Sequence, residues 1–473
     1  MGSVEPQSFN VKRVAVIGAG PCGLSAAKYL VAQGAFDKIV IFEKQSEVAG
    51  VWLYSDRPTE TLHIPQENAF CPPDPPITSN PPGEPPVFPT PMYGLLHTNI
   101  PKRLMQFQDQ DFEKDSLIFP AREDVEAYLI KYSQDVRHLI RFSTQVNDVL
   151  LQNVDAADQW EVFSESLVSG ERTTETFDAV VVASGHYSVP FLPNVKNIRE
   201  FSKAHPSVIT HAKLYRHPEQ YRDQKVVVVG NAASGLDIAT QISRLAAKPT
   251  LLSARHPTPP ENLAHSGCEE VPVIEEFLVA ERGVRFSDGR IERDLDAVIY
   301  CTGYLYTLPF LENLKPQPVT TGRRIHGIYK DLIHIEHPTL AFPGLPMKVV
   351  PLPFSESQAA IFSRVWANEL QLPPADEMRR WEEDAVSSRK EGPHVYPKGG
   401  DADYINETHA WLKRASSKGK EPPLWDEELC WERTIYAEAK LKFEQTGRTA
   451  MSLGELGFHY TPSAKDEESK EIL

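Results

Sequence analysis

The sequence lacks any long apolar run. No stretch of about 20 consecutive apolar residues is present, which excludes a transmembrane helix. The first segment, MGSVEPQSFNVKR, also lacks the hydrophobic core of about 7–15 residues that a secretory signal requires. We therefore expect a cytoplasmic protein without a transmembrane anchor.

Cysteine and clustered basic residues are also sparse. The 473 residues include five cysteines and no CxxC pair, so we expect no disulfide framework, redox dithiol or cysteine-rich zinc site, and we predict no metal. The net charge of -16, without a run of Lys and Arg, argues against a nucleic acid partner. The length suits two or three domains, and 41% hydrophobic with 24% charged residues is a globular composition.

Short runs of β-branched residues are the main structural signal. They occur at 13–18, 38–43, 179–184, 226–230 and 297–303, and helical patterns follow at least two of them. Such runs predict buried parallel strands and an α/β fold.

Three other segments differ from this pattern. The proline-rich residues 71–91 cannot form a helix or a central strand, so they predict a long loop, either a functional lid or a mere insertion. The charged stretch 372–428 is interrupted by Pro and Gly, but its tryptophans predict packing against the body. We expect residues 463–473 to be a disordered tail.

The first nucleotide motif is VAVIGAGPCGLSAAKYL. It places Gly18, Gly20 and Gly23 between a predicted strand and a predicted helix. The three glycines allow the tight turn, the approach of a pyrophosphate and close helix packing, while the helix N-terminus offers N–H donors. Glu43, 20 residues after Gly23, ends the next strand, where a carboxylate accepts hydrogen bonds from a ribose.

The second motif, KVVVVGNAASGLDIATQI, repeats this arrangement with Gly230, Ala232 and Gly235. After the next strand, TLLSARH, Ser253 and Arg255 stand where the acid is expected. A carboxylate would repel a 2′-phosphate, whereas Arg binds one with two hydrogen bonds. The contrast assigns FAD to the first motif and NADP to the second.

With both motifs in place, the chain resembles the flavin-containing monooxygenases, particularly their soluble fungal and yeast-type members. The resemblance extends to AGVW, LLHTNIPKRLMQFQD, TQVNDVL, VASGHY, YCTGY and GLPMKVVPLPFSESQAA. HPSVITHAKLY is similar to the motif FxGxxxHxxxY; it keeps His211 and Tyr215, but His205 and Ser207 replace the aromatic residue and the glycine. His211 is interpreted as a structural histidine rather than a catalytic base.

The resemblance and the two motifs together identify candidate cofactor residues. For FAD they are Gly18, Gly20, Pro21, Cys22, Gly23, Glu43, Lys44, Gly50, Val51, Trp52, Thr98, Asn99, Val146 (through its backbone), Ser184, Gly185, Thr302, Gly303 and Gln358. For NADP they are Lys213, Tyr215, Arg216, Gly230, Ala232, Ser234, Gly235, Ser253 and Arg255.

The resemblance implies a fold of two Rossmann-like domains, with the NADP domain inserted into a discontinuous FAD domain. The FAD domain is expected at 10–189 and 306–462, and the NADP domain at 190–305. VASGHY and YCTGY are the expected crossings between them.

The implied activity is an NADPH-dependent monooxygenation. NADPH reduces FAD, dioxygen adds to form a flavin hydroperoxide, and a soft nitrogen or sulfur atom of a small molecule takes one oxygen atom. Asn99 is the catalytic candidate, because an amide both donates and accepts without titrating.

Alternatives stay open at this point. They are a Baeyer–Villiger monooxygenase acting on a ketone and a non-catalytic nucleotide-binding scaffold or redox sensor. The sequence does not identify the substrate. A role in fungal secondary metabolism and a homodimer are both compatible with the sequence.

Overall fold

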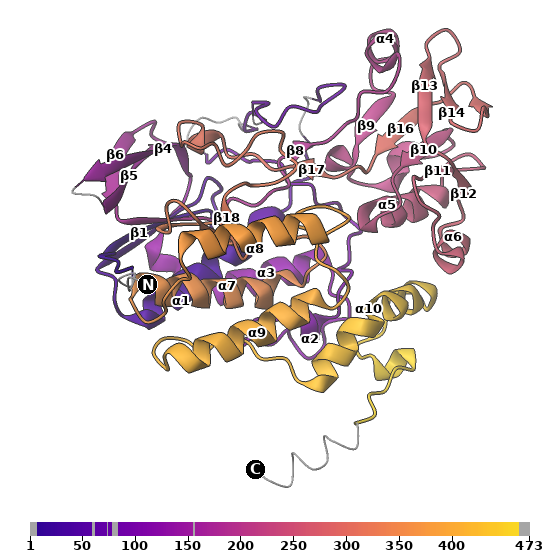
Figure 1. Cartoon of the computed structure of the whole chain (residues 1–473). Coiled ribbons are helices and arrows are strands. Elements are labelled where there is room, and N and C mark those ends of the chain that lie inside the picture. Colours follow the sequence, from indigo (N-terminus) through magenta and orange to yellow (C-terminus); the bar gives the residue numbers. More distant parts are fainter. Residues whose placement is uncertain (1–6, 59–61, 73, 78–83, 155–156, 463–473) are drawn as a thin grey trace.

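The structure is a computed structural model that describes residues 7–58, 62–72, 74–77, 84–154 and 157–462 (Figure 1). Its first sheet has seven strands in the order β18-β19-β20-β7-β1-β2-β3. These are β1 (Arg13–Ile17), β2 (Lys38–Phe42), β3 (Ile140–Arg141), β7 (Ala179–Val182), β18 (Ile328–Tyr329), β19 (Ile333–His334) and β20 (Leu340–Ala341). β1 pairs in parallel with both β2 and β7.

The second sheet has five strands in the order β12-β11-β10-β16-β9, and every neighbouring pair is parallel. The strands are β9 (Ile209–His211), β10 (Val226–Val229), β11 (Leu251–Ser253), β12 (Glu269–Val271) and β16 (Ala297–Tyr300), with helices α4 (Ile198–Ala204), α5 (Ala233–Ser243) and α6 (Pro260–Ser266) nearby. All five β-branched runs therefore form parallel strands, and the predicted α/β fold with two dinucleotide-type sheets is confirmed.

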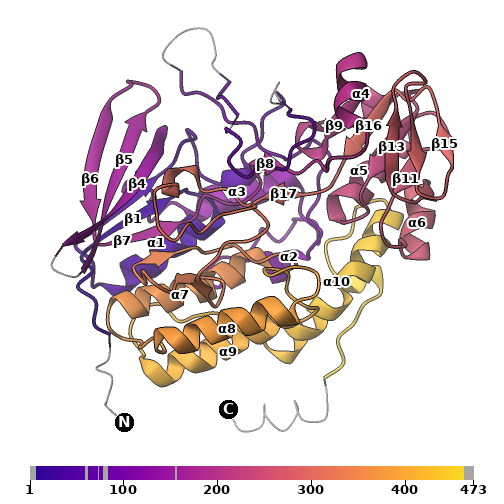
Figure 2. The same cartoon turned by 45° about the horizontal axis from the view of Figure 1, so that its top comes forward.

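Two small antiparallel sheets were not predicted. One consists of β4 (Thr144–Val154), β5 (Ala157–Ser166) and β6 (Arg172–Phe177), the other of β13 (Ile274–Leu278), β14 (Gly283–Phe286) and β15 (Ile291–Glu292). Figure 2 shows them at opposite ends of the molecule.

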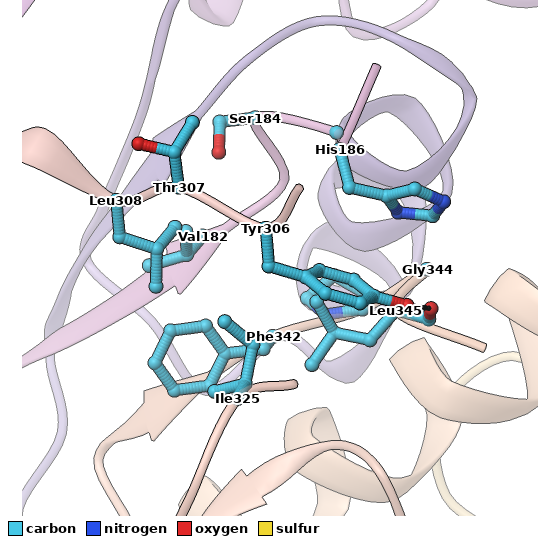
Figure 3. A pocket seen from close by; sticks show the side chains of 12 residues that line it. Val182, Ser184, His186, Tyr306, Thr307, Leu308, Ile325, Phe342, Gly344 and Leu345 are labelled. Atoms are coloured by element: carbon cyan, nitrogen blue, oxygen red, sulfur yellow. Dashed lines mark hydrogen bonds between the residues drawn. The ribbon is translucent and has the colours of Figure 1, made fainter. Parts of the chain in front are cut away.

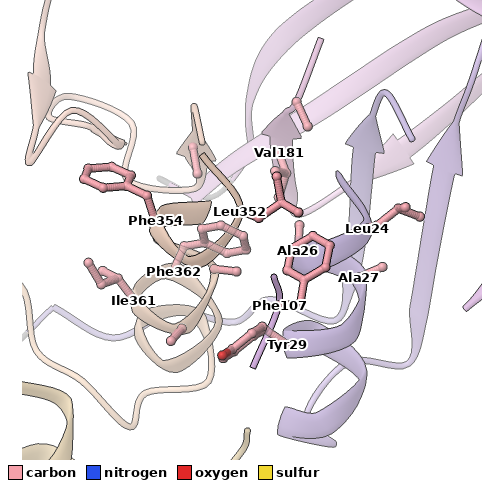
Figure 4. Close-up of a cluster of buried hydrophobic side chains, with 14 of the residues drawn as sticks. Leu24, Ala26, Ala27, Tyr29, Phe107, Val181, Leu352, Phe354, Ile361 and Phe362 are labelled. Carbon is pink, nitrogen blue, oxygen red and sulfur yellow. The ribbon is translucent and has the colours of Figure 1, made fainter. Parts of the chain in front are cut away.

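Helices α1 (Pro21–Gln33) and α7 (Pro351–Trp366) pack closely beside the first sheet. Leu24 and Ala27 of α1 share one buried cluster with Leu352 and Phe362 of α7 (Figure 4). Nearly all of α7 is buried, including polar and charged side chains such as Glu356 and Arg364. The packing of α7 against α1 thus holds in place the helix that follows the first glycine turn.

Five further helices lie around α1 and α7 (Figure 1). They are α2 (Lys102–Met105), α3 (Arg122–Tyr132), α8 (Ala375–Ser388), α9 (Gly400–Ala415) and α10 (Glu427–Gln445). Trp381 packs edge-on against Tyr329, and Trp425 is buried, so the predicted packing of 372–428 is confirmed. The two helices in this stretch were not foreseen, and 463–473 lie outside the described residues.

The chain passes between the two large sheets at β8 (Val189–Pro190) and β17 (Tyr304–Leu305). These two short strands pair antiparallel, directly after VASGHY and within YCTGY. Among the described residues, no helix combines the length and apolar character needed to cross a bilayer.

Candidate functional site

The first glycine turn has the geometry of a phosphate cradle. Gly18 has a φ of +103°, and a Cβ added there would lie 2.5 Å from the carbonyl oxygen of Ala183. A Cβ on Gly23 would lie 1.9 Å from the Gly18 carbonyl oxygen, so the helix can approach the strand only with glycine at this position. Gly20 is the N-cap of α1 and supplies no side-chain cap, which leaves backbone donors for a phosphate.

A second turn closes this cradle. Gly50 has a φ of +57° and begins the 3₁₀ helix Gly50–Trp52; a Cβ on it would lie 3.0 Å from the Cα of Gly20. Val51 and Trp52 are half-buried beside the cradle. The two glycines thus bring the segments after β1 and β2 to near backbone contact.

Glu43 lies at the end of β2, with 4% of its surface exposed. Its Oε2 accepts a hydrogen bond from the Ala19 N–H (2.7 Å) and its Oε1 from the Gln45 N–H (2.8 Å). Burial raises its pKa, against which these hydrogen bonds act. The carboxylate stabilises the turn and keeps further lone pairs for a ribose.

The second turn repeats the first almost feature by feature. Gly230 has a φ of +106°, with its added Cβ 2.8 Å from the Cys301 carbonyl oxygen, and a Cβ on Gly235 would lie 1.9 Å from the Gly230 oxygen. Ala232 is the N-cap of α5, and it and Ser234 are exposed. This second cradle also leaves helix donors without a side-chain cap.

The strand register shows which residue of the second cradle takes the place of Glu43, the carboxylate expected to bind the ribose in the first. Ser253 pairs with Val229 and accepts the Gly230 N–H, as Phe42 pairs with Ile17 and accepts the Gly18 N–H. Ala254, one residue later, therefore occupies the place of Glu43. The predicted absence of an acid is correct, but Ser253 is not its replacement.

Two side chains near the second cradle differ in availability. The Ser253 hydroxyl is buried and donates to the Pro272 carbonyl (2.9 Å), and its contact with NADP stays a prediction. Arg255 corresponds to Lys44 in the first cradle, and its side chain is exposed. An exposed guanidinium without an acid beside it suits a 2′-phosphate.

Asn99 and Tyr187 are two exposed polar side chains in segments that the motifs identified. Asn99 is exposed, whereas the Thr98 hydroxyl is buried and donates to the Ile100 carbonyl (2.9 Å), so Thr98 supports the loop. Tyr187 is 44% exposed and lies edge-on to Tyr304 at 5.4 Å. Desolvation raises its pKa, so its phenol stays protonated.

Tyr187 was not among the predicted residues. The signal was available, since an aromatic residue directly follows the glycine turn in VASGHY.

A small pocket lies between the loops that follow β7 and β20 (Figure 3). Ser184, Gly185 and Gly344 line it, and Gly344 approaches the Cys22 thiol so closely that an added Cβ would lie 2.5 Å from the sulfur. Burial raises the pKa of Cys22 to about 12, so its sulfur stays a neutral thiol.

Gln358 does not reach this pocket. It is fully buried, accepts the Gly344 N–H at Oε1 (2.8 Å) and donates from Nε2 to the Asp331 carbonyl (3.2 Å). Tertiary packing thus uses both ends of the amide to hold the pocket loop, and a contact of Gln358 with FAD stays a prediction.

Three of the predicted NADP residues are also enclosed. Tyr215 is buried and donates to Gln241 Oε1 (2.9 Å). Lys213 is paired with Asp74 and the Ser188 carbonyl. Arg216 donates to the carbonyls of Lys213, Tyr215 and Thr90 at 2.8–3.2 Å. Their side chains hold protein segments together, and their contact with NADP stays a prediction.

His211 is structural. It is buried, its Nδ1 accepts the Lys213 N–H (3.1 Å), and its Nε2 donates to the Gly303 carbonyl (3.2 Å). Burial lowers its pKa to about 3, so the ring stays neutral. This agrees with the interpretation from the sequence.

The other predicted positions lie at the crossing or in the core. Thr302 donates to the Phe191 carbonyl, and Gly303 has a φ of +82° at β17. Val146 is buried beside an irregularity in β4, which leaves its expected backbone contact to FAD as a prediction. Within the described residues, no group of three His, Cys, Asp or Glu side chains could hold a metal ion.

The two cradles fit two dinucleotides. At the glycines a Cβ would collide with neighbouring backbone, and both helix N-termini lack a side-chain cap. Known proteins agree with this geometry. A family model described as flavin-binding monooxygenase-like matches residues 89–259 and 269–424, and one for an NAD(P)-binding Rossmann-like domain matches 16–75.

Individual relatives extend over most of the chain. Thiol-specific monooxygenase of Saccharomyces cerevisiae is 32% identical over 437 residues, covering 88% of this chain and 90% of that protein. The structure of S-allyl-L-cysteine S-oxygenase from Allium sativum is similar with a TM-score of 0.75 and 25% identity, over 99% of this chain and 100% of that one. Tmm from a Pelagibacter strain has a TM-score of 0.71 and 26% identity, over 91% of both chains.

The family model matches more than half of this chain, and the yeast protein aligns with most of it. The chain belongs to the flavin-binding monooxygenase family and is an NADPH-dependent flavin monooxygenase with FAD as its flavin.

Proposed function

We propose that this enzyme transfers one oxygen atom to a soft sulfur or nitrogen atom of a small molecule, with sulfur preferred. Bound FAD, once reduced by NADPH, supplies the oxygen chemistry, and dioxygen is the second substrate. Two relatives named for sulfur oxygenation, the yeast thiol-specific monooxygenase and the garlic S-oxygenase, support the preference. Trimethylamine monooxygenase of Pelagibacter, 31% identical over 381 residues, keeps nitrogen within the proposal.

The observation that carries the proposal is that the exposed candidate side chains Asn99 and Tyr187 are both neutral. The raised pKa of Tyr187 keeps its phenol protonated, and the Asn99 amide does not titrate. A neutral thioether or amine already has its nucleophilic lone pair and needs no general base. The protein then has only to position the reactants and exclude water.

We assign the positioning role to Asn99. Its amide is exposed, and no hydrogen bond of its side chain is found within the described part of the chain. An amide offers donors and an acceptor at once, so it can orient the nicotinamide and the substrate without changing charge.

The division of the chain forms part of the proposal. We assign FAD to residues 10–189 and 306–462, and NADP to 190–305. The pairing of β8 with β17, where the chain passes between the sheets, supports these limits. We also place the enzyme in the cytoplasm.

A substrate panel tests the proposal. The purified yellow protein is mixed with NADPH in air and with thioanisole, 2-mercaptoethanol, N,N-dimethylaniline or cyclohexanone. NADPH consumption and product mass are then measured. We expect the sulfur compounds to gain one oxygen atom fastest and the amine next. Oxygenation of the ketone alone would overturn the assignment in favour of Baeyer–Villiger chemistry.

A further inference from the structure

The proline-rich part of the chain connects the two large sheets. We call its described residues 66–72, 74–77 and 84–94 the strap. Beside the crossing, the Gln66 N–H donates to the Leu192 carbonyl (3.0 Å) and the Leu192 N–H donates back (2.9 Å). The Asn194 N–H donates to Glu67 Oε1 (3.3 Å). In Figure 2 the indigo strap lies above β8.

The strap is also fixed to the first cradle. Phe88 exchanges two hydrogen bonds with the side chain of Gln45, from Gln45 Nε2 to its carbonyl (2.6 Å) and from its N–H to Gln45 Oε1 (3.1 Å). The Lys44 ammonium lies 4.6 Å from the centre of the Phe88 ring. Gln45 and Lys44 directly follow Glu43, so this end of the strap is attached beside the FAD ribose position.

At the NADP side, the strap binds two basic residues of the second sheet's domain. Lys213 is 4% exposed, and its ammonium donates to the Asp74 carboxylate and to the Ser188 carbonyl. Arg216 is 2% exposed, donates to the Thr90 carbonyl (3.2 Å) and accepts the Gly94 N–H at its own carbonyl (3.0 Å).

The cation of this ion pair is the buried partner, since the Lys213 side chain is 5% exposed and the Asp74 side chain 20% exposed. If Lys213 turned to a phosphate, its ammonium would have to leave both the Asp74 carboxylate and the Ser188 carbonyl, and breaking the contacts of a buried cation is unfavourable. We therefore expect the Asp74–Lys213 ion pair to remain formed.

We infer that Asp74 and Lys213 are positioning residues for hydride transfer. By tying the strap to the second sheet, the pair fixes the NADP cradle relative to the FAD cradle, so that nicotinamide and flavin can meet. The inference rests on the two cofactors of the family and not on the proposed substrate. Hydride transfer depends steeply on such placement, because misplacement by about 1 Å can slow a reaction a hundredfold.

Anaerobic stopped-flow reduction of the bound flavin by NADPH tests this without any oxygenation substrate. We expect Asp74→Asn and Lys213→Met to lower the limiting reduction rate by the same factor, roughly ten- to a hundredfold, and to leave the Kd of NADPH almost unchanged. The double variant Asp74→Lys/Lys213→Asp should recover much of the rate. Lys348→Met, which removes one partner of the exposed Lys348–Glu391 pair, is the control.

Hydrogen–deuterium exchange of the purified proteins gives a second readout. The amides of Gln66, Leu192 and Gly94 should exchange faster in both single variants and should be protected again in the double variant. Where a single variant fails to fold, the double variant and Lys213→Arg decide the outcome.

Other results would overturn the inference. A Kd for NADPH that rises in Lys213→Met but not in Asp74→Asn would make Lys213 a nucleotide ligand. Unchanged reduction rates in both single variants, or a double variant that folds but recovers neither rate nor protection, would remove the positioning role. Failure of the substrate panel would leave this test unaffected, because flavin reduction precedes oxygenation.

Discussion

Glu356, in the middle of α7, is expected to destabilise the folded protein at neutral and alkaline pH. It is fully buried, its Oε2 accepts the Gln108 N–H (2.9 Å), and its Oε1 has no hydrogen-bond partner. Lys420 lies 3.6 Å away but is shared with Asp109 at 3.3 Å. Burial raises the pKa of Glu356 from 4.5 to about 7, more than Lys420 lowers it. Replacement by Gln removes the buried charge and keeps the shape.

The raised pKa fixes the direction of the pH effect. Below about pH 4.5 the side chain is neutral in the folded and unfolded chain, and it contributes no penalty. As the pH rises through about 7, the folded state must ionise a buried carboxyl, and this stability is lost. The pKa difference corresponds to a penalty of roughly 3 kcal/mol on the ionised form.

Thermal unfolding of Glu356→Gln and of the unmodified protein, from pH 5.5 to 8.5, measures the effect. We expect a Tm only slightly higher for the variant at pH 5.5, where part of the penalty is already present, and a Tm higher by on the order of 5 °C at pH 8.5. Glu391→Gln, at an exposed carboxylate, is the control and should show no such trend. The Tm difference between the variant and the unmodified protein should therefore grow from pH 5.5 to pH 8.5. A difference that shrinks or changes sign would show that the Lys420 pair outweighs desolvation and would refute this reasoning.

Three further changes test the site itself. Asn99→Leu should keep FAD bound and reducible but release more hydrogen peroxide per NADPH consumed; unchanged coupling in a peroxide assay would contradict its positioning role. Arg255→Ala should weaken NADPH binding about tenfold or more and leave NADH binding nearly unchanged, as titration of both nucleotides would show. Gly23→Ala should abolish FAD retention, measured as the 450 nm absorbance per chain, because the new Cβ would lie 1.9 Å from the Gly18 carbonyl oxygen.

The elements that the sequence predicted well depend on local chemistry. A run such as Val226–Val229 is apolar at every position, which suits only a strand buried on both faces. Glycines such as Gly18 and Gly230, which have a positive φ in the structure, predict a turn from the sequence alone. Helices α8 and α9 were missed because their exposed faces are charged and their flanks carry Pro and Gly, so the narrow buried face around Met378 and Leu412 gave too weak a signal.

Several side chains that the sequence suggested as cofactor contacts form hydrogen bonds with partners far away in the sequence. Lys213 and Arg216 have the charge of phosphate ligands, but Asp74 and Thr90, more than 100 residues earlier, enclose them. Gln358 likewise faces two backbone groups of other loops. Charge and motif position indicated that these residues matter, but only the tertiary contacts showed what they hold.

The two cradles also show how one backbone design can select two nucleotides. Gly18 and Gly230 share φ, strand register and helix geometry, so the backbone offers both sites the same pyrophosphate contacts. The difference begins at the next strand end, where Glu43 stands in the first site and Ala254 in the second. A buried carboxylate beside a ribose favours free hydroxyl groups and opposes a phosphate, whereas alanine followed by the exposed Arg255 removes the repulsion and adds an attractive charge. Because the glycine turns share their backbone geometry, we expect this pair of residues to contribute most to the separation of the flavin site from the NADP site.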